Sequence, residues 1–253
     1  MKQNTLINQQ FGNTAQAYLS SCVHAEGVDL QRITRLTHNY TGSNALDLGC
    51  GAGHTAFAMA KAGATVTAYD LSPQMLALVE NEAVRRGLMG ITTQQGVAEK
   101  LPFADASFDL VATRFSAHHW TDVAAAMCEV RRVLKPTGML IVIDVVAAEN
   151  ALFDTLLQAV EILRDASHIR DYRVSEWHAI LYAAGFDVRE SDSWTLTMEF
   201  PIWTSRMRTS ELRVNAIRDV LSKASDEARQ YFKVQADSSF DIDVAWLAAK
   251  PKR

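Results

Sequence analysis

The chain has 253 residues, which is enough for one large α/β domain or two small ones with buried cores. Apolar residues make up 48% of the chain and charged residues 21%, a globular composition that excludes long disordered tracts. Because 25 basic side chains stand against 29 acidic ones, the net charge of −4 provides no basic excess to neutralise a nucleic-acid backbone.

The cysteines, the N-terminus and the hydropathy pattern bear on the cellular compartment. Cys22, Cys50 and Cys128 are odd in number and form no C-x-x-C pair, so neither a disulfide framework nor a cysteine-rich zinc site is expected. The first eleven residues are polar and lack the apolar core of a signal peptide. The longest apolar run, residues 139–148, contains Asp144 and is too short to cross a bilayer. We therefore expect a cytoplasmic protein without membrane insertion.

Short β-rich runs alternate with helical patterns through the first 146 residues. Ser72 followed by Pro73 is typical of a helix start, with a serine N-cap and proline in the first turn. Apolar residues recur at helical spacing from Val123 to Leu134, whereas the run at 139–146 is typical of a strand buried on both faces. We expect helical structure at 13–37, 54–62, 73–86 and 123–134, and strands at 45–48, 65–69, 91–95, 108–113 and 139–146.

The regular alternation of short strands and helices ends at residue 146. We expect amphipathic helices at 152–163 and around 177–181, a long strand at 186–200, helical structure at 204–234 and a last strand at 240–248. The two long strands are expected to pair antiparallel at the edge of the sheet. The whole pattern predicts an α/β fold: a doubly wound, mostly parallel seven-stranded sheet with an antiparallel edge strand and helical additions.

A glycine-rich turn follows the first predicted strand. Asp47 leads into Gly49, Gly51 and Gly53, so a ligand can approach bare backbone near a positive helix terminus. Such a turn lies at the carboxyl ends of the strands, where open α/β sheets bind their ligands. Asp70 ends the second predicted strand about twenty residues further on, where its carboxylate can accept hydrogen bonds from both hydroxyls of a ribose.

The spacing of the glycines distinguishes between two classes of ligand. The fingerprint of nicotinamide dehydrogenases, G-x-G-x-x-G/A, requires Gly or Ala at position 54, where this chain has His54. The observed pattern, Asp-x-Gly-x-Gly-x-Gly, is instead typical of S-adenosylmethionine (SAM) sites. A glycine-rich turn without any ligand is a third interpretation, which the presence of Asp70 disfavours.

Five motifs occur in the same order as in a known family. They are ALDLGCGAG at 45–53, DLSPQML at 70–76, AEKLPF at 98–103, SFDLV at 107–111 and RRVLKPTG at 131–138. On these motifs the chain resembles the class I SAM-dependent methyltransferases, and it is most similar to the small-molecule branch that includes the quinone-biosynthesis (UbiE-like) enzymes. The segment FGNTAQAY at 11–18 also resembles the start of that branch. Beyond residue 150 only the order of helices and strands agrees.

The resemblance also implies which residues hold SAM, and these fall into two groups according to the part of SAM that they would contact. The methionine part would be held by Asp47, by the turn at Gly49, Cys50, Gly51 and Gly53, by Arg114, and by Tyr18, which would close over it. The ribose and adenine would be held by Asp70, Leu71, Met75, Ala98 and Glu99.

One position departs from the family pattern. Relatives often carry an acid just before the Ala-Glu pair, which accepts from the adenine amino group, whereas this chain has Val97. We therefore expect adenine to be recognised by backbone and shape. The resemblance further implies a single domain, with an N-terminal helical cap at 1–42, a SAM-binding core at 43–146, and lid helices and edge strands on the substrate side at 147–253.

Two adjacent histidines, His118 and His119, follow the fourth predicted strand and should face the ligand crevice. Methyl transfer from a sulfonium needs mainly alignment, and it needs a base only where the acceptor atom carries a proton. Histidine is the natural base here, although neighbours on regular structure cannot both point the same way. We expect at least one of them to face the acceptor; alternatively, one packs locally and the other orders the loop. Neither has a partner at metal-ligand spacing, so no metal is expected.

Residues after position 150 are expected to form a lid over the acceptor, although each of them could instead belong to the core or to a solvated face. They are Phe153, His168, Arg170, Tyr172, Trp203, Arg206 and Arg208. The arginines among them favour an anionic acceptor.

These observations predict transfer of a methyl group from SAM to a small-molecule acceptor, leaving S-adenosylhomocysteine, by a monomer or homodimer without a metal. Nucleic acid is not expected as the acceptor, because the residues at 113–116 lack the Asn/Asp-Pro-Pro-aromatic motif of amino-directed adenine methyltransferases. Two alternatives remain open: a SAM-binding module without transfer activity, and a nicotinamide-dependent oxidoreductase.

Overall fold

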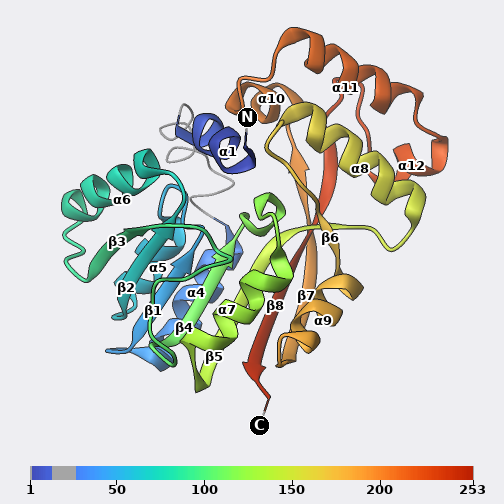
Figure 1. The fold of residues 1–253 in the computed structure, drawn as a ribbon. Helices are drawn as coiled ribbons and strands as arrows, with labels where there is room; N and C mark the ends of the chain where they lie inside the picture. The colour runs from blue at the N-terminus through green and yellow to red at the C-terminus, as the bar shows by residue number, and fades with distance from the viewer. Residues whose placement is uncertain (1, 13–26, 253) are drawn as a thin grey trace.

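The strands of the described chain join one mixed sheet. The computed structural model describes residues 2–12 and 27–252 (Figure 1), and its strands lie in the order β3-β2-β1-β4-β5-β8-β7, with β6 beside β5. Neighbours run parallel from β3 to β5, whereas β8 is antiparallel to both β5 and β7. The strands are β1 Asn44–Leu48, β2 Thr65–Asp70, β3 Ile91–Gln95, β4 Phe108–Arg114, β5 Leu134–Ala147, β6 Tyr172–Arg173, β7 Phe186–Met198 and β8 Phe240–Pro251.

This topology confirms the predicted doubly wound fold and the antiparallel pairing of the last two long strands. From β1 the chain proceeds to β2 and β3 on one side, then crosses to β4 and β5 on the other. Leu46 of β1 consequently has Thr67 of β2 as one neighbour and Val111 of β4 as the other. The order of strands reverses between β1 and β4, and the crevice beyond their carboxyl ends is where such sheets bind ligands.

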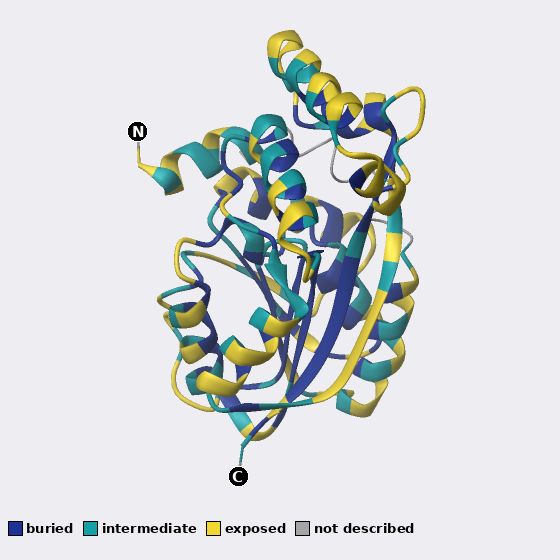
Figure 2. Ribbon diagram, turned by 90° about the vertical axis from the view of Figure 1, so that its right-hand side faces the viewer, coloured by how far each residue is buried: buried dark blue, intermediate teal, exposed yellow. Residues whose placement is uncertain are grey.

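Helices cover both faces of the sheet, and Figure 2 shows the buried residues concentrated along the strands and the inner faces of these helices. One face packs against α4 (Val28–Thr37), α5 (His54–Lys61) and α6 (Pro73–Arg85). The other packs against α7 (Val123–Val133) and α9 (Val174–Ala183). Strand β4 is buried on both sides because Val111 contributes to the second core and its neighbours Leu110 and Ala112 to the first.

A third apolar cluster lies where β7 ends and β8 begins. It joins α8 (Ala151–Arg164), α10 (Phe200–Arg206) and α11 (Glu211–Lys223), and it includes Phe232 directly after α12 (Asp226–Tyr231). Helix α1 (Gln3–Gly12) lies at the same end of the molecule (Figure 1), so this end carries helices at the carboxyl edge of the parallel strands. None of the described helices is both long and apolar enough to cross a membrane.

Several boundaries differ from the predictions. Strand β5 begins at Leu134 rather than at 139, and residues 135–138 bulge opposite Asp109, which is where a sheet tolerates Pro136. Helix α10 begins at Phe200, which was predicted to end a strand. Helix α1 precedes the helical structure predicted at 13–37, of which α4 falls within the described residues, and the single-turn η1 (His38–Tyr40) follows α4 directly.

Candidate active site

The glycine turn connects β1 to α5 and uses two of its glycines in different ways. Gly49 and Gly51 both have positive φ angles, 72° and 48°. A Cβ atom on Gly49 would lie 1.9 Å from the Ser116 hydroxyl oxygen, whereas one on Gly51 would meet nothing within 4 Å. Gly49 therefore permits the close approach of the loop after β4, and Gly51 leaves open space beside the turn.

Alanine substitutions at these two glycines should have unequal effects on folding. Both variants would incur the left-handed backbone penalty of about 1–2 kcal/mol. We expect Gly49→Ala to lose a further 1–3 kcal/mol or so, because its methyl group overlaps Ser116. Urea unfolding of the two variants beside the wild type would measure the difference, and equal losses would contradict this account of Gly49.

Asp70 lies directly beside the turn, at the end of β2. The Gly51 N–H donates to its Oδ2 and the Ser72 N–H to its Oδ1, each at 2.8 Å. Burial raises the pKa of Asp70, while these two backbone N–H groups oppose the shift. Each carboxylate oxygen accepts one backbone hydrogen bond and so retains capacity for another, as binding of a diol requires.

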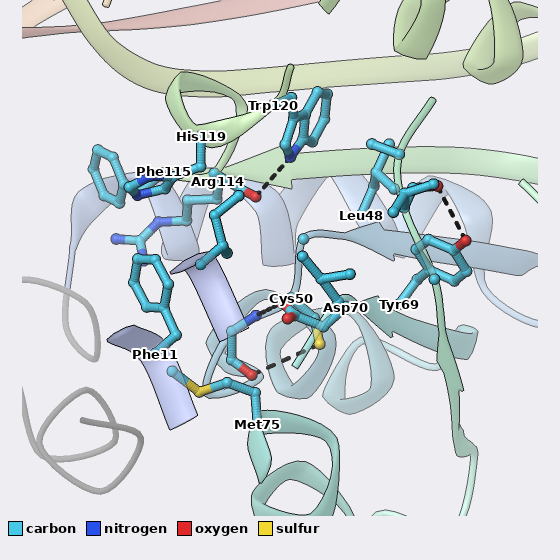
Figure 3. A pocket seen from close by; sticks show the side chains of 18 of the residues that line it. Phe11, Leu48, Cys50, Tyr69, Asp70, Met75, Arg114, Phe115, His119 and Trp120 are labelled. Carbon is cyan, nitrogen blue, oxygen red and sulfur yellow. Dashed lines mark hydrogen bonds between the residues drawn. The ribbon is translucent and has the colours of Figure 1, made fainter. Parts of the chain in front are cut away.

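A cavity with about 970 Å³ of empty space opens above the turn. Figure 3 shows Cys50 and Asp70 on one side of it and Phe115 and His119 on the other, with Phe11 close to Met75. Nine of the twelve residues that the resemblance assigned to SAM line this cavity. They are Gly49, Cys50, Gly51, Asp70, Leu71, Met75, Ala98, Glu99 and Arg114.

The other three residues do not line it. Asp47 is buried behind the turn, where its carboxylate accepts a hydrogen bond at 2.8 Å from Ala56 N–H in the first turn of α5. Burial raises the pKa of Asp47 to about 7. Gly53 packs on Val79, since a Cβ there would lie 2.8 Å from its methyl group. The structure thus gives Asp47 and Gly53 roles in shaping the turn, and Tyr18 lies outside the described residues.

Two charged lining residues, Glu99 and Arg114, bond to other residues of the protein. Glu99 Oε1 accepts hydrogen bonds from the backbone and hydroxyl of Thr121, at 2.9 and 2.7 Å, and so joins the loop after β3 to the start of α7. Arg114 Nε lies 2.5 Å from Asp29 Oδ2, and both of these side chains are buried. Val97, the departure from the family pattern, also lines the cavity, and its carbonyl accepts from the Tyr69 hydroxyl at 3.1 Å.

Helix α1 supplies lining residues that the sequence analysis missed. Asn4, Ile7 and Phe11 recur at intervals of three and four, so they share the helix face toward the cavity. Two glutamine side chains fix the helix. Gln3 donates to the Ser167 carbonyl at 2.8 Å and Gln10 to the Met207 carbonyl at 2.9 Å. The spacing of Ile7 and Phe11 was one signal of this role in the sequence.

The two histidines occupy a single 3-10 turn, η2 (Ala117–His119), after β4. His118 Nδ1 donates to Asp144 Oδ1 at 2.6 Å, and no residue within 2–12 or 27–252 hydrogen-bonds its Nε2. Burial lowers the pKa of His118, but the Asp144 carboxylate outweighs burial and the pKa rises to about 9. In the absence of ligand, His118 is therefore an imidazolium at neutral pH, oriented by an acid on β5.

The pKa of His119 is shifted in the opposite direction to that of His118. Its Nδ1 donates to the Ser167 carbonyl at 3.2 Å, and its Nε2 lies 3.9 Å from Asp165 Oδ2. Burial and the neighbouring positive charge of His118 lower its pKa to about 4. The two ring centroids lie 4.2 Å apart, and the Nδ1 atoms of the two rings bond to different partners.

The charge on His118 should make stability depend on pH. Its folded pKa of about 9 exceeds the ordinary value of 6.5, so the stabilisation is complete below pH 6.5 and disappears as the pH rises through 9. We expect up to about 3 kcal/mol, or several degrees in Tm. Thermal unfolding of wild type and His118→Asn should show a Tm difference that shrinks between pH 6.5 and 9. A difference independent of pH would contradict the ion pair.

A second cavity, with about 590 Å³ of empty space, adjoins the first. Phe11, Phe115 and His119 border both cavities and form the wall between them, while His118 borders only the second. Of the predicted lid residues, Trp203 and Arg206 line this second cavity.

The other predicted lid residues lie apart from the lining. His168 is buried with its ring centroid 5.7 Å from that of His118, Phe153 stacks on Tyr231, and Arg170 pairs with Asp154 and Glu176. Tyr172 packs edge-on against Trp177, so its role is in the core. Within the described ranges, no cluster of three or more His, Cys, Asp and Glu side chains is arranged to hold a metal ion.

Comparison with known proteins identifies the family. Residues 46–142 match the family described as "Methyltransferase domain". The uncharacterized protein YafE of Escherichia coli is 47% identical over 78% of this chain and 95% of its own length. The uncharacterized methyltransferase YcgJ of Bacillus subtilis is 36% identical over 88% of each chain. The demethylmenaquinone methyltransferase of Chlorobaculum parvum is 42% identical over 44% of each chain.

Solved structures agree with these relatives. The crystal structure of Bacillus subtilis YcgJ superimposes with a TM-score of 0.83 at 31% identity, over 88% of this chain and 99% of that one. A putative methyltransferase from Bacillus halodurans gives a TM-score of 0.86 at 31% identity, and the match covers 90% of this chain and 100% of that one. The chain therefore belongs to the SAM-dependent methyltransferases, enzymes of the methyltransferase-domain family, and it transfers a methyl group from SAM to an acceptor.

Proposed function

We propose that the first cavity holds SAM, that the second holds a small-molecule acceptor, and that the methyl group passes between them beside Phe11, Phe115 and His119. The observation that carries the proposal is that these three residues border both cavities. Two ligands that meet at a shared wall can be aligned for in-line displacement, and alignment supplies much of the rate in such reactions.

The residues around the glycine turn fit the adenosyl part of SAM. Asp70 retains hydrogen-bonding capacity for the two ribose hydroxyls, and the open side of Gly51 admits the ligand without a clash. Leu71 and Met75 offer apolar contacts for the faces of adenine, and Ala98 offers its backbone. The methionine part of SAM would contact Gly49, Cys50 and Arg114. Asp47 and Gly53 would contribute indirectly, by shaping the glycine turn.

When bound, SAM supplies a methyl group on a positively charged sulfur, and the electron pair of the broken carbon–sulfur bond stays on the sulfur. The protein has to direct the acceptor's lone pair toward that methyl carbon and to remove a proton where the acceptor atom carries one. His118 suits the second task better than His119, because its Nε2 has no partner within the described chain while Asp144 fixes Nδ1. In its neutral form, His118 accepts the proton at Nε2 and becomes the imidazolium that Asp144 stabilises.

Calorimetry tests the assignment of the first cavity. We expect the purified protein, stripped of any carried-over ligand, to bind SAM and S-adenosylhomocysteine and to ignore reduced nicotinamide cofactors. Absence of binding to both sulfur compounds would contradict the proposal. Binding without turnover across a broad acceptor panel would instead indicate a SAM-binding module.

The remaining parts of the proposal concern assembly and location. We infer a cytoplasmic enzyme that acts as a monomer or homodimer on a diffusible small molecule, with neither a metal nor nucleic acid in the reaction. Light scattering of the purified protein and activity in the presence of a chelator would check the assembly and the metal.

A further inference from the structure

Asp171 is a buried acid whose side chain makes no hydrogen bond with the residues that the structure describes. It lies just before β6, borders the second cavity and is only 1% exposed. Its Oδ2 forms no hydrogen bond with the described residues, and those residues provide none to Oδ1 either. The neighbouring His168 Nε2 is 3.7 Å from Oδ2 and is engaged instead with Gln158 Oε1 at 3.1 Å.

The backbone of Asp171, by contrast, is held firmly. Its N–H donates to Gln158 Oε1 at 3.1 Å, and Gln158 Nε2 donates to its carbonyl at 2.8 Å. The side chain is therefore presented at the cavity wall by a fixed backbone. A functional group held in this way loses little entropy when a ligand binds it.

The other acids around the second cavity are paired. Asp144 is bonded to His118, and Glu161 lies 3.4 Å from Arg164. Asp154 pairs with two arginines outside the cavity. Buried polar groups in proteins are nearly always hydrogen-bonded, so an unpaired one at a cavity wall points to a ligand that completes it.

The charges facing Asp171 decide which kind of hydrogen bond it makes. Glu161 and Asp154 face it from α8, Asp144 from β5, His118 from η2 and His168 from its own loop. Burial and the carboxylate of Glu161 raise its pKa well above the ordinary value, while the charge of His118 opposes the shift. The surroundings of Asp171 thus favour its protonated form, which can donate a hydrogen bond.

Much of the remaining lining is apolar, although His118, His119, Glu161, Arg164 and Arg206 also line the cavity. Its aromatic walls come from Phe11, Phe115 and Trp203, and aliphatic side chains from β5, β7 and β8 complete them. A ligand with an apolar surface would contact these walls, and an oxygen atom on it could bond to Asp171 in the same lining.

We propose that Asp171 determines specificity by hydrogen-bonding an oxygen atom of the methyl acceptor, so that the second cavity selects acceptors that carry a hydroxyl or carbonyl oxygen beside an apolar surface. The inference rests on the proposed function of that cavity. It adds a residue that neither the motifs nor the family resemblance singled out.

The test compares two probes that differ by one hydroxyl group, 2-indanol and indane, with the protein saturated by S-adenosylhomocysteine. Ligand-observed NMR gives both dissociation constants. We expect the wild type to prefer 2-indanol by about tenfold, because a site that hydrogen-bonds an oxygen rejects the analogue without it. The preference should disappear in Asp171→Leu and persist within about threefold in Asp171→Asn, whose amide still donates.

Asp165→Asn is the matched control, since Asp165 is a buried acid on the same segment that does not border the cavity. It should keep the preference. Asp171→Leu should also unfold at a higher Tm, because it removes a buried polar group without a partner, and Asp171→Ala serves if leucine disturbs folding.

The outcomes separate this inference from the proposed function. A wild type that fails to bind S-adenosylhomocysteine overturns the proposed function. If the wild type binds that compound normally, three results overturn the role of Asp171. The first two are no preference for 2-indanol and binding of neither probe. The third is a preference that stays unchanged in Asp171→Leu and Asp171→Ala.

Discussion

Replacement of Asp70 by alanine should weaken SAM binding by a factor on the order of 10² to 10⁴. The estimate assumes two hydrogen bonds between a carboxylate and the ribose hydroxyls, each contributing roughly 1.5–3 kcal/mol. The same change removes the acceptor of Gly51 N–H and Ser72 N–H, so the turn also loses the hydrogen bond that holds Gly51 to β2. Titration calorimetry with SAM measures the loss directly.

Two further variants make the Asp70 result specific. Asp70→Asn keeps one acceptor oxygen and should bind with intermediate affinity. Asp219→Ala, which removes an exposed carboxylate on α11, should bind SAM as the wild type does. Wild-type affinity in Asp70→Ala would show that the ligand does not sit at the turn.

Replacement of His118 by asparagine should lower kcat by about 10² to 10⁴ for an acceptor that must lose a proton, which is the range for loss of a general base. SAM affinity should stay within about threefold, because His118 borders only the second cavity. Coupled detection of S-adenosylhomocysteine release measures the rate. An unchanged kcat would exclude His118 as the base.

The pH profile gives a second measurement of the same group. Since the base must be neutral and the pKa of His118 is about 9, the wild-type rate should rise with pH until about 9. Asp144→Asn removes the carboxylate that raises this pKa, so the midpoint should move down toward 6.5 or lower. A rate that instead falls above pH 9 would identify the imidazolium as the active form, stabilising a negatively charged acceptor.

The parts of the site that could be predicted from the sequence are those that local segments determine. The turn at Gly49 and Gly51 follows its strand directly, and Asp70 ends the next strand, so the parallel pairing of β1 and β2 is enough to bring them together. Serine-capped α6 is equally local, since Ser72 Oγ accepts from Met75 N–H only three residues away.

The second cavity could not be predicted in this way because its parts are distant in the chain. The partner of His118 is 26 residues away on β5, and α1 is fixed by contacts to Ser167 and Met207. One signal was present in the sequence. Asp144 interrupts an otherwise apolar strand, and an acid in a buried strand requires a partner. Asp171 carried no comparable signal in the sequence. That its side chain makes no hydrogen bond with the described residues is known only from the structure.

The attachment of α1 has a consequence for how related sequences can diverge. Gln3 and Gln10 both donate to main-chain carbonyls, at Ser167 and Met207. Every amino acid provides a carbonyl, so mutations at positions 167 and 207 leave both acceptors in place as long as the backbone keeps its course. For these two hydrogen bonds, the requirement for a particular side chain falls on the glutamines, and homologues can vary the side chains at positions 167 and 207 while retaining both bonds.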